Sequence, residues 1–471
     1  MLRIFLFHGN QKNDFLFASQ FASYLRHLVK VAATHKNILA LALPISFALL
    51  IPQLSFLANT IFLGRYGERE LAVNGVAGVF YLTISMIGYG LSSGIQIQLA
   101  RRAGEGDQEG LTKSLANGIS LSLLGSLTLM LLSLWLAPLI FGFSLSDANN
   151  AQMSINYLFI RVWGLPFLLL TQQINAFFIA TNRSRFLIYG SLSGTLTNIL
   201  FDYLLIFGQF DFPRLGINGA AIASILGELA YCFVMFSLFF GHRFQHQYPL
   251  RRFLSFDLSL SKRSLRIASP LIVQYLFSIG GWQVFFIFVE HLGTRQLAAS
   301  QILRSIFGVI GIGTWAMAAT CNTMVSNIIG QGRQEEVLSL IRKVAKLSLI
   351  YTLVVSTILF VFADQFLLLY RDDPILVHYA KPSMVVIIIA TLIMAISTVV
   401  FNGVVGTGNT LVNLSIEITS VVVYLVYCYL VIQRLQLSLA WAWGSEFVYW
   451  SILLILAILY LRSGKWKGKI I

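Results

Sequence analysis

The apolar stretch ALPISFALLIPQLSFLANTIFLGRYG, residues 42–67, has a counterpart in ASPLIVQYLFSIGGWQVFFIFVEHLG, residues 268–293. Each has a proline at its third position and ends with a glycine, and the two begin 226 residues apart. Beyond them the same offset joins, without a gap, Leu71-Ala72 to Leu297-Ala298, Gly104 to Gly330, Gly106 to Gly332, Thr181 to Thr407, and Tyr203-Leu204 to Tyr429-Leu430. Because chance matches scatter over many offsets, we infer two copies of one unit.

The composition predicts that both copies lie in a membrane. Apolar residues make up 57% of the chain and charged residues only 11%, against about 25% charged in globular domains. Apolar windows of about 20 residues, enough for a helix to cross a bilayer, recur throughout. We therefore predict an all-α polytopic membrane protein with twelve transmembrane helices in two pseudo-symmetric six-helix bundles. The predicted helices are 38–63, 71–100, 113–142, 153–181, 185–208, 218–241, 265–291, 297–329, 340–369, 382–405, 410–433 and 438–462.

The longest polar connection separates the two copies and sets the predicted domains. Each copy has an even number of helices, so both enter the membrane from the same side and the repeats are parallel. The segment before the first helix includes an amphipathic stretch at 15–31 that is typical of a helix on the membrane surface. The predicted parts are a cytoplasmic N-terminal segment at 1–36, an N-terminal lobe at 37–241, a cytoplasmic linker at 242–264, a C-terminal lobe at 265–462 and a basic tail at 463–471.

The basic residues predict the orientation. Of the 33 lysines and arginines, 24 fall on the side of the two termini and 7 on the opposite side, while Arg161 and Arg304 lie within helices. Cytoplasmic loops carry the excess of Lys and Arg. We therefore expect both termini in the cytoplasm and the protein in a bacterial cytoplasmic (inner) membrane. Basic loops facing an anionic leaflet also explain the net charge of +14 without nucleic acid as a partner.

Ionisable side chains within apolar helices mark candidate functional positions, because each costs about 2.5–3.5 kcal/mol on insertion scales. Structural pairing or snorkelling is the expected state of most of them: Glu228 either faces a polar interior or pairs with Arg161, and a similar link between Glu417 and Arg304 is expected in the second half. The full set is Asp202, Glu228, Glu417, Glu446, Arg161 and Arg304.

Asp202 is the best candidate for ion coupling. Asn198 lies one helical turn earlier on the same face, and we expect Asn59 and Ser224 at a similar depth in neighbouring helices. Burial favours the protonated form of a carboxyl, so such a group can exchange a proton near neutral pH. The offset of 226 pairs Asp202 with Cys428, so the second copy lacks this acid. That asymmetry favours function; the alternative is a structural carboxyl that is permanently protonated and hydrogen-bonded.

Other polar and aromatic side chains within the helices predict a substrate cavity. Aromatic faces suit organic cations, although aromatic residues near helix ends also form interfacial belts. The candidate substrate-binding residues are Asn175, Gln53, Gln172, Trp163, Gln274 and Trp282, with Tyr275 as a further aromatic wall.

Motifs for cofactors or metals are not found in the sequence. Gly104-x-Gly106 and its repeat follow apolar helices rather than strands, and are typical of tight turns. The chain has neither GxxxxGK[ST], which binds the phosphates of ATP, nor HExxH, which binds zinc. We therefore expect no cofactor and no metal.

Four segments together resemble the multidrug and toxic compound extrusion (MATE) family of antiporters, and the resemblance covers residues 36–460. They are the stretch 42–67 quoted above, TLTNILFDYLLIFG at 195–208, GINGAAIAS at 216–224 and VEHLGTRQLAASQI at 289–302. The resemblance to proton-coupled bacterial members implies a protonation network in the N-terminal lobe. Its members would be Asp202, Asn198, Ser224 in place of a threonine, and Asn175.

Two departures from the family pattern bear on the coupling ion. The usual V-D-T of the first helix is Ala58-Asn59-Thr60, which leaves Asp202 as the only carboxyl of the network. The sodium-coupled branch carries a glutamate in helix 7 where this chain has Ser278, and helix 10 has no acid. The resemblance therefore implies no cation site in the C-terminal lobe.

We accordingly expect a monomeric secondary transporter that exports small organic, cationic or amphipathic compounds by alternating access. Its coupling ion would be the proton, with sodium as the alternative. A flippase or exporter of a lipid-linked or metabolite substrate from the same superfamily is the second hypothesis. A membrane-embedded transferase is a third, but the only acid-base pair near a helix end is Glu290-His291.

Overall fold

The computed structural model describes residues 30–145, 147–241, 244–253, 257–365 and 374–468. Residues 15–29 of the expected surface helix lie outside them. The described secondary structure is helical throughout. The first half contains α2 (His35–Tyr66), α3 (Glu68–Glu105), α4 (Gln108–Ser144), α5 (Ala148–Arg161), η1 (Val162–Gly164), α6 (Leu165–Ala180), α7 (Arg185–Phe207) and α8 (Ile217–Gly241). The second contains α10 (Leu258–Glu290), α11 (Thr294–Gly330), η3 (Gln334–Glu336), α12 (Val337–Val361), α14 (Pro374–Gly406), α15 (Thr410–Cys428), η4 (Tyr429–Arg434), α16 (Leu439–Trp443) and α17 (Ser445–Arg462).

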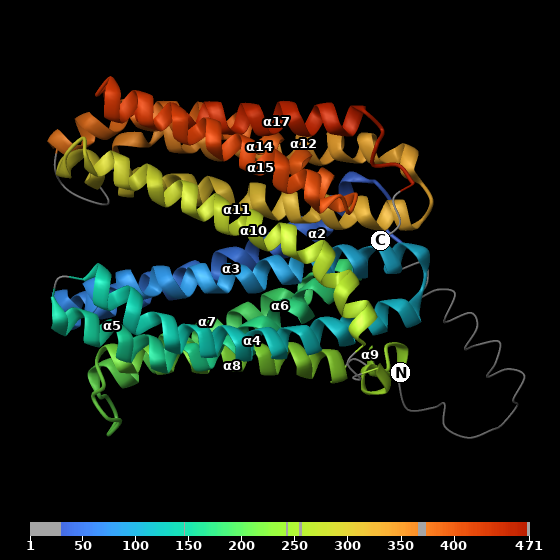
Figure 1. The fold of residues 1–471 in the computed structure, drawn as a ribbon, viewed down its shortest axis with the longest axis horizontal. Helices are drawn as coiled ribbons and strands as arrows, with labels where there is room; N and C mark the ends of the chain where they lie inside the picture. The colour runs from blue at the N-terminus through green and yellow to red at the C-terminus, as the bar shows by residue number, and fades with distance from the viewer. Residues whose placement is uncertain (1–29, 146, 242–243, 254–256, 366–373, 469–471) are drawn as a thin grey trace, which may run out of the picture.

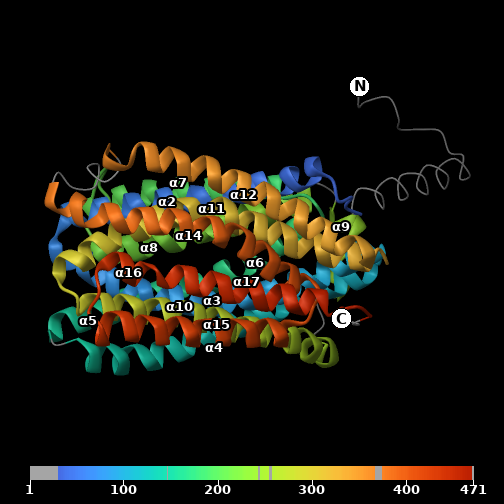
Figure 2. The same ribbon diagram turned by 90° about the horizontal axis from the view of Figure 1, so that it is seen from above.

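Eleven helical segments within the described residues are long and apolar enough to cross a membrane. They count α5 to α6, α15 to η4 and α16 to α17 as one segment each. Helix α7 is also long enough, with 23 residues, but it is more polar because its buried face carries Asn198 and Asp202. With α7 the count is twelve, as predicted. Figures 1 and 2 show the long helices running along the long axis of the molecule, and in Figure 1 they form two groups that correspond to the two repeats.

The fourth predicted span is interrupted. It begins at Ala148 and changes to a short 3-10 turn at residues 162–164 before α6 continues. A side chain at Gly164 would place its Cβ 2.0 Å from Glu228 Oε2 and 2.6 Å from an Arg161 guanidinium nitrogen. Pro166 then lies in the first turn of α6, where its missing N–H breaks no helical hydrogen bond. The interruption therefore makes room for a buried ion pair.

The connection between the two halves is anchored to the first half. It contains α9 (Phe244–Gln247) and η2 (Leu250–Phe253). Phe244 packs against Phe178 of α6, with ring centroids 5.9 Å apart, and the Arg183 guanidinium lies 4.2 Å from its ring centroid. Burial raises the pKa of the Tyr248 phenol to about 12. Helix α10 begins at Leu258, inside the stretch predicted as linker, because the Asp257 side chain accepts hydrogen bonds from its first backbone N–H groups.

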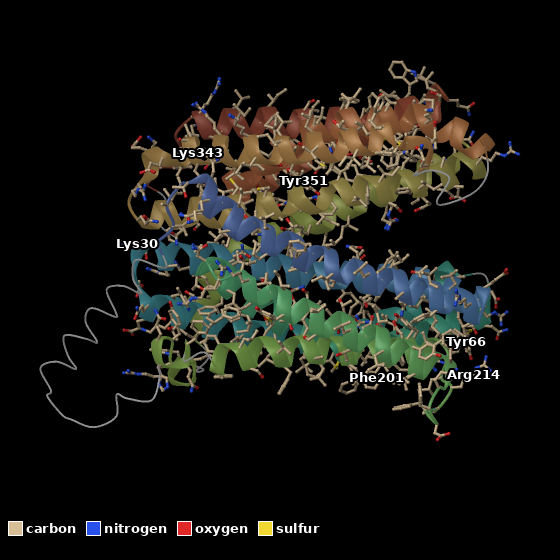
Figure 3. All side chains as sticks on the ribbon, turned by 180° about the vertical axis from the view of Figure 1, so that it is seen from behind. Lys30, Tyr66, Phe201, Arg214, Lys343 and Tyr351 are labelled. Atoms are coloured by element: carbon tan, nitrogen blue, oxygen red, sulfur yellow. The ribbon has the colours of Figure 1, made fainter. Side chains whose placement is uncertain are left out.

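The two ends of the molecule differ in charge. Lys30 and Lys343 lie at one end, and Tyr66 and Arg214 at the other (Figure 3). We call the first the basic end, because it contains the turns with most of the lysines and arginines, and the second the far end. The expected cytoplasmic position of the basic end stays a prediction.

At the basic end, α3 and α11 pack in a way that repeats the internal symmetry. A Cβ on Gly104 would lie 2.0 Å from the backbone oxygen of Asn327, and one on Gly330 would lie 2.2 Å from that of Arg101. These two pairs are related by the offset of 226. The Asn327 side chain also donates to the backbone oxygen of Ala100 at 3.2 Å. The helix backbones thus touch here, which only glycine permits.

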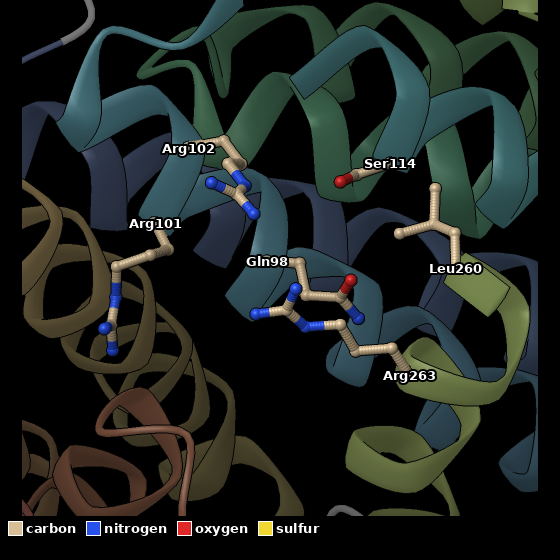
Figure 4. A pocket seen from close by; sticks show the side chains of 6 residues that line it. All are labelled: Gln98, Arg101, Arg102, Ser114, Leu260 and Arg263. Carbon is tan, nitrogen blue, oxygen red and sulfur yellow. The ribbon is translucent and has the colours of Figure 1, made fainter. Parts of the chain in front are cut away.

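The seam between the halves continues along α3 and α10. Figure 4 shows a small cavity in it, where Gln98 lies beside Arg263 of α10. Asn117 of α4 donates to Ser264 at 3.1 Å. Among the described hydrogen bonds and ring contacts between the halves, the one farthest from the basic end joins Tyr275 to Ser93 and Tyr89. Beyond it the two groups of helices diverge toward the far end (Figure 1).

Candidate functional site

Glycines bring α7 and α8 close together around the predicted coupling residues. The Cβ of a side chain at Gly227 would lie 2.9 Å from the backbone oxygen of Gly194, and one at Gly194 would lie 3.0 Å from the backbone oxygen of Gly227. Such an added Cβ at Gly227 would also lie 2.9 Å from the Cβ of Asn198. Asn198 can therefore reach α8, and Asp202 follows one turn later on the same buried face.

Hydrogen bonds join these residues to α2 and α8. The Asn59 amide nitrogen donates to both carboxyl oxygens of Asp202, at 3.3 Å each. The Asn198 amide nitrogen donates to the hydroxyl of Ser224 at 3.5 Å, and its oxygen accepts from the hydroxyl of Ser55. Asp202 is fully buried. The structure thus brings together the four predicted residues and adds Ser55, while their role in coupling stays a prediction.

No basic side chain within the described residues lies within ion-pair distance of Asp202. The cation that acts on it electrostatically is Arg161, but this guanidinium already binds both oxygens of Glu228, at 2.6 and 2.9 Å. Tyr81 donates to the same carboxylate at 3.1 Å, and Arg161 lies 3.8 Å from the centroid of its ring. The predicted pairing of Glu228 with Arg161 is therefore confirmed, and it leaves Asp202 with neutral donors only.

The predicted substrate residues of the first half do not form one surface. Asn175 turns toward α8, where its amide donates to the Tyr231 hydroxyl at 3.1 Å. Gln172 packs against α3 at Gly88. Gln53 is exposed on α2, and Trp163 is 59% exposed at the break before α6. Their part in substrate binding stays a prediction.

In the second half, the two predicted substrate residues lie on the same face of α10. Gln274 is buried and accepts a hydrogen bond from Asn413 of α15. Trp282 packs against Phe307, with ring centroids 5.7 Å apart. Tyr275 instead turns toward the first half, where its ring centroid lies 5.1 Å from that of Tyr89. Tyr89 and Tyr275 therefore form a ring contact between the two halves, beyond which the two groups of helices diverge (Figure 1).

The predicted pairing of Glu417 with Arg304 is wrong. Glu417 accepts hydrogen bonds from the Ser278 hydroxyl and from the Tyr449 hydroxyl, the latter at 2.8 Å. Arg304 instead lies over Trp282, 5.7 Å from the ring centroid. The sequence shows both acids of the second half, but not which side chains face them, because that depends on the rotation of each helix within the bundle.

Comparison with known proteins accounts for this architecture. The family model described as MatE matches the chain twice, over residues 44–204 and 270–430. The chain belongs to the MatE family. The two matches begin 226 residues apart, which confirms the internal duplication. Members of this family are transporters rather than enzymes, so the transferase hypothesis is excluded.

Relatives and solved structures agree with the family assignment. The chain is 24% identical to "Probable multidrug resistance protein NorM" of Thermotoga maritima, over 96% of this chain and 97% of that protein. It is 25% identical to "Multidrug resistance protein MdtK" of Cronobacter sakazakii, over 74% and 76%. A crystal structure of MATE in complex with MaL6 superposes with a TM-score of 0.87 at 18% identity, covering 94% of this chain and 99% of that one. An outward-facing multidrug resistance MATE family transporter superposes with a TM-score of 0.86 at 19% identity, over the same shares. The predicted fold is thereby confirmed.

Proposed function

We propose that this MatE transporter exports small organic compounds, cationic or amphipathic, in exchange for protons. The substrate would bind between the halves above Tyr89 and Tyr275, and Asp202 would carry the proton. The names of the relatives as multidrug resistance proteins support export of such compounds. The single observation that carries the proton assignment is the burial of Asp202 beside a neutral donor, the amide of Asn59.

The physical argument concerns charge. A carboxylate within a bilayer needs a compensating cation or a proton, and the nearest acting guanidinium, Arg161, is held by Glu228. The group facing Asp202 is the amide nitrogen of Asn59. In this orientation the Asn59 amide presents its N–H, which stabilises a carboxylate, and not its oxygen, which is the type of ligand that a sodium ion binds. This arrangement favours a proton over sodium at the site.

Transport requires that the proton and the substrate stabilise different states. The present structure is closed at the basic end by the glycine contacts between α3 and α11. We propose that substrate binding stabilises a state open at the basic end, and that protonation of Asp202 favours release at the far end. A ligand shifts such an equilibrium only through its different affinity for the two states.

The test uses the purified protein in liposomes with an imposed pH gradient and ethidium, a lipophilic organic cation, as the probe. We expect Asp202→Asn to abolish gradient-driven ethidium transport. The matched control is Asp211→Asn, which changes an exposed aspartate in the loop after α7 and leaves transport intact. Transport at the wild-type rate in Asp202→Asn would refute the assignment.

The flippase hypothesis finds less support. A lipid-linked substrate with a pyrophosphate needs cationic side chains that are free to bind it. Of the two arginines predicted to lie within the membrane, Arg161 is bonded to Glu228 and Arg304 lies over the ring of Trp282.

A further inference from the structure

Two carboxyl groups in the second half are buried and have no cationic partner among the described residues. Glu417 on α15 is 1% exposed and Glu446 on α17 is 2% exposed. Their described hydrogen-bond partners are hydroxyl and indole groups. Glu228 in the first half shows the contrasting arrangement, since it is bonded to the guanidinium of Arg161. A buried carboxyl with only neutral partners is charged at high cost, so its protonation state depends on the state of its surroundings.

The partners of Glu417 can serve both of its protonation states. Ser278 and Tyr449 donate to the same carboxyl oxygen. The Ser278 hydroxyl also lies 3.1 Å from the backbone oxygen of Gln274, to which it can donate instead. A hydroxyl both donates and accepts. When Glu417 carries a proton, it can therefore donate to Ser278, and Ser278 then donates to Gln274.

Glu446 also has partners for both states. The indole N–H of Trp450 donates to it at 2.8 Å, and that of Trp282 is within hydrogen-bonding reach. Indole N–H groups only donate, so they stabilise the ionised form. The buried hydroxyls of Tyr424 and Ser445 lack a hydrogen-bond partner of normal geometry, and Tyr424 interacts electrostatically with Glu446. A phenol hydroxyl can accept as well as donate, so Tyr424, which lies close enough to Glu446 to interact with it, can accept a hydrogen bond from the protonated form.

The neighbouring helices present few other titratable groups. Tyr449 interacts electrostatically with both glutamates, and Cys428 and Tyr424 lie near Glu446. Helix α10 presents Tyr275, which interacts electrostatically with Glu417. Helix α11 presents Arg304, whose guanidinium lies over the Trp282 ring, 5.7 Å from its centroid. The only charged side chain among the described residues of α14 is Lys381, which pairs with Asp364 at 2.8 Å.

One face of α10 links the two glutamates to the seam between the halves. Gln274, Ser278 and Trp282 are spaced four residues apart, so they lie on the same face of this helix. Ser278 contacts Glu417 and Trp282 reaches Glu446. Tyr275, in the same stretch of α10, forms the contact with Tyr89 of the first half. A change of protonation at either glutamate therefore acts on the helix that carries the interlobe contact.

We propose that Glu417 and Glu446 form a second proton-binding site, which gains and loses a proton during the transport cycle. The proton passes between this site and water, no other bond is formed or broken, and the hydrogen bonds of Ser278 reverse. Tyr449 lies close enough to both glutamates to interact with each of them electrostatically. The inference rests on proposed proton-driven export, and it places a second exchange site in the half that lacks Asp202.

The test is infrared spectroscopy of the purified full chain over the range from about pH 5 to about pH 9, where a buried glutamate titrates. The signal is the C=O stretch of protonated carboxyl groups, measured in the Asp202→Asn background so that Asp202 makes no contribution. We expect a buried carboxyl signal that disappears as the pH rises, and that is reduced by adding either Glu417→Gln or Glu446→Gln. Adding Glu335→Gln, whose side chain is 86% exposed, is the matched control and leaves the buried signal unchanged.

Two outcomes would overturn the proposal. One is a buried signal that stays constant over the whole range, which means permanently protonated structural carboxyls. The other is a signal that sodium chloride, compared with choline chloride, removes at fixed pH, which means a sodium site. If a Gln variant does not fold, the same measurement is made on Ser278→Ala, which retains both glutamates. This variant is expected to change the pH at which the buried carboxyl signal disappears, and an unchanged titration would count against the site.

This measurement is independent of the test of the proposed function. The proposal of proton-driven export is refuted if ethidium transport by the wild type does not depend on the pH gradient. The second site fails if the infrared signal does not titrate, even where transport responds to the gradient.

Discussion

Adding one methyl group at the basic-end seam is expected to push the two halves apart. An alanine Cβ at Gly104 would lie 2.0 Å from a backbone oxygen of α11, and one at Gly330 would lie 2.2 Å from a backbone oxygen of α3. Carbon and oxygen approach to about 3.3 Å, so the helices must separate by about 1 Å. Backbone atoms cannot rotate away as a flexible side chain would.

The size of the effect follows from overpacking. Extra carbon atoms in a well-packed contact cost about 1–3 kcal/mol. In this carrier the cost falls only on the state closed at the basic end. The equilibrium between the two states is therefore expected to shift by about five- to 150-fold toward the state open at that end. Gly78→Ala on α3 is the matched control, because its Cβ would meet no atom within 4 Å.

The assay is the distance between two spin labels at the basic end, one on Glu109 of α4 and one on Arg342 of α12, both exposed. We expect Gly104→Ala and Gly330→Ala to shift the distribution to longer distances, while Gly78→Ala leaves it as in the wild type. If both seam variants give the wild-type distribution, this contact does not hold the halves together and the reasoning fails.

Two further predictions concern the Arg161–Glu228 ion pair and the contact between Tyr89 and Tyr275. Arg161→Gln leaves Glu228 without its cation in a largely buried site, and should lower the free energy of unfolding by about 3–5 kcal/mol. The control Arg333→Gln breaks a half-exposed pair with Glu336 and should lower it by less than about 1 kcal/mol. Equal losses of thermal stability in the two variants would contradict this prediction. Tyr275→Ala removes an aromatic face from the proposed substrate region and should weaken ethidium binding about two- to thirtyfold. The control Tyr189→Ala changes an exposed tyrosine of α7 and should bind ethidium as the wild type does. Fluorescence titration measures both affinities, and equal affinities would place the substrate elsewhere.

Much of the fold was predictable because the repeat and the apolar windows are local signals. The asparagine and aspartate of α7 were identified because residues four apart share a helix face. Ser55 was missed, since the rotation of α2 that turns it toward Asn198 is set by packing between distant segments. The break at Gly164 was also missed. It depends on the Arg161–Glu228 pair formed between α5 and α8, which no local pattern reveals.

The partner of Glu417 was wrongly predicted for a related reason. Pairing opposite charges is the simplest way to bury an acid, and Arg304 was the available cation in that half. The structure satisfies Glu417 with hydroxyl groups instead. Ser, Tyr and Trp residues in the same apolar helices as the two acids are compatible with such an arrangement, but the contacts require the three-dimensional packing of α10, α15 and α17.

The central claim, that Asp202 exchanges its proton when substrate binds, is tested most directly by counting protons. Ethidium is added to the purified protein in a weakly buffered solution, and the released protons are measured with a pH indicator. The account predicts that Asp202→Asn releases about one proton fewer per molecule than the wild type. Equal release from the two proteins would contradict it.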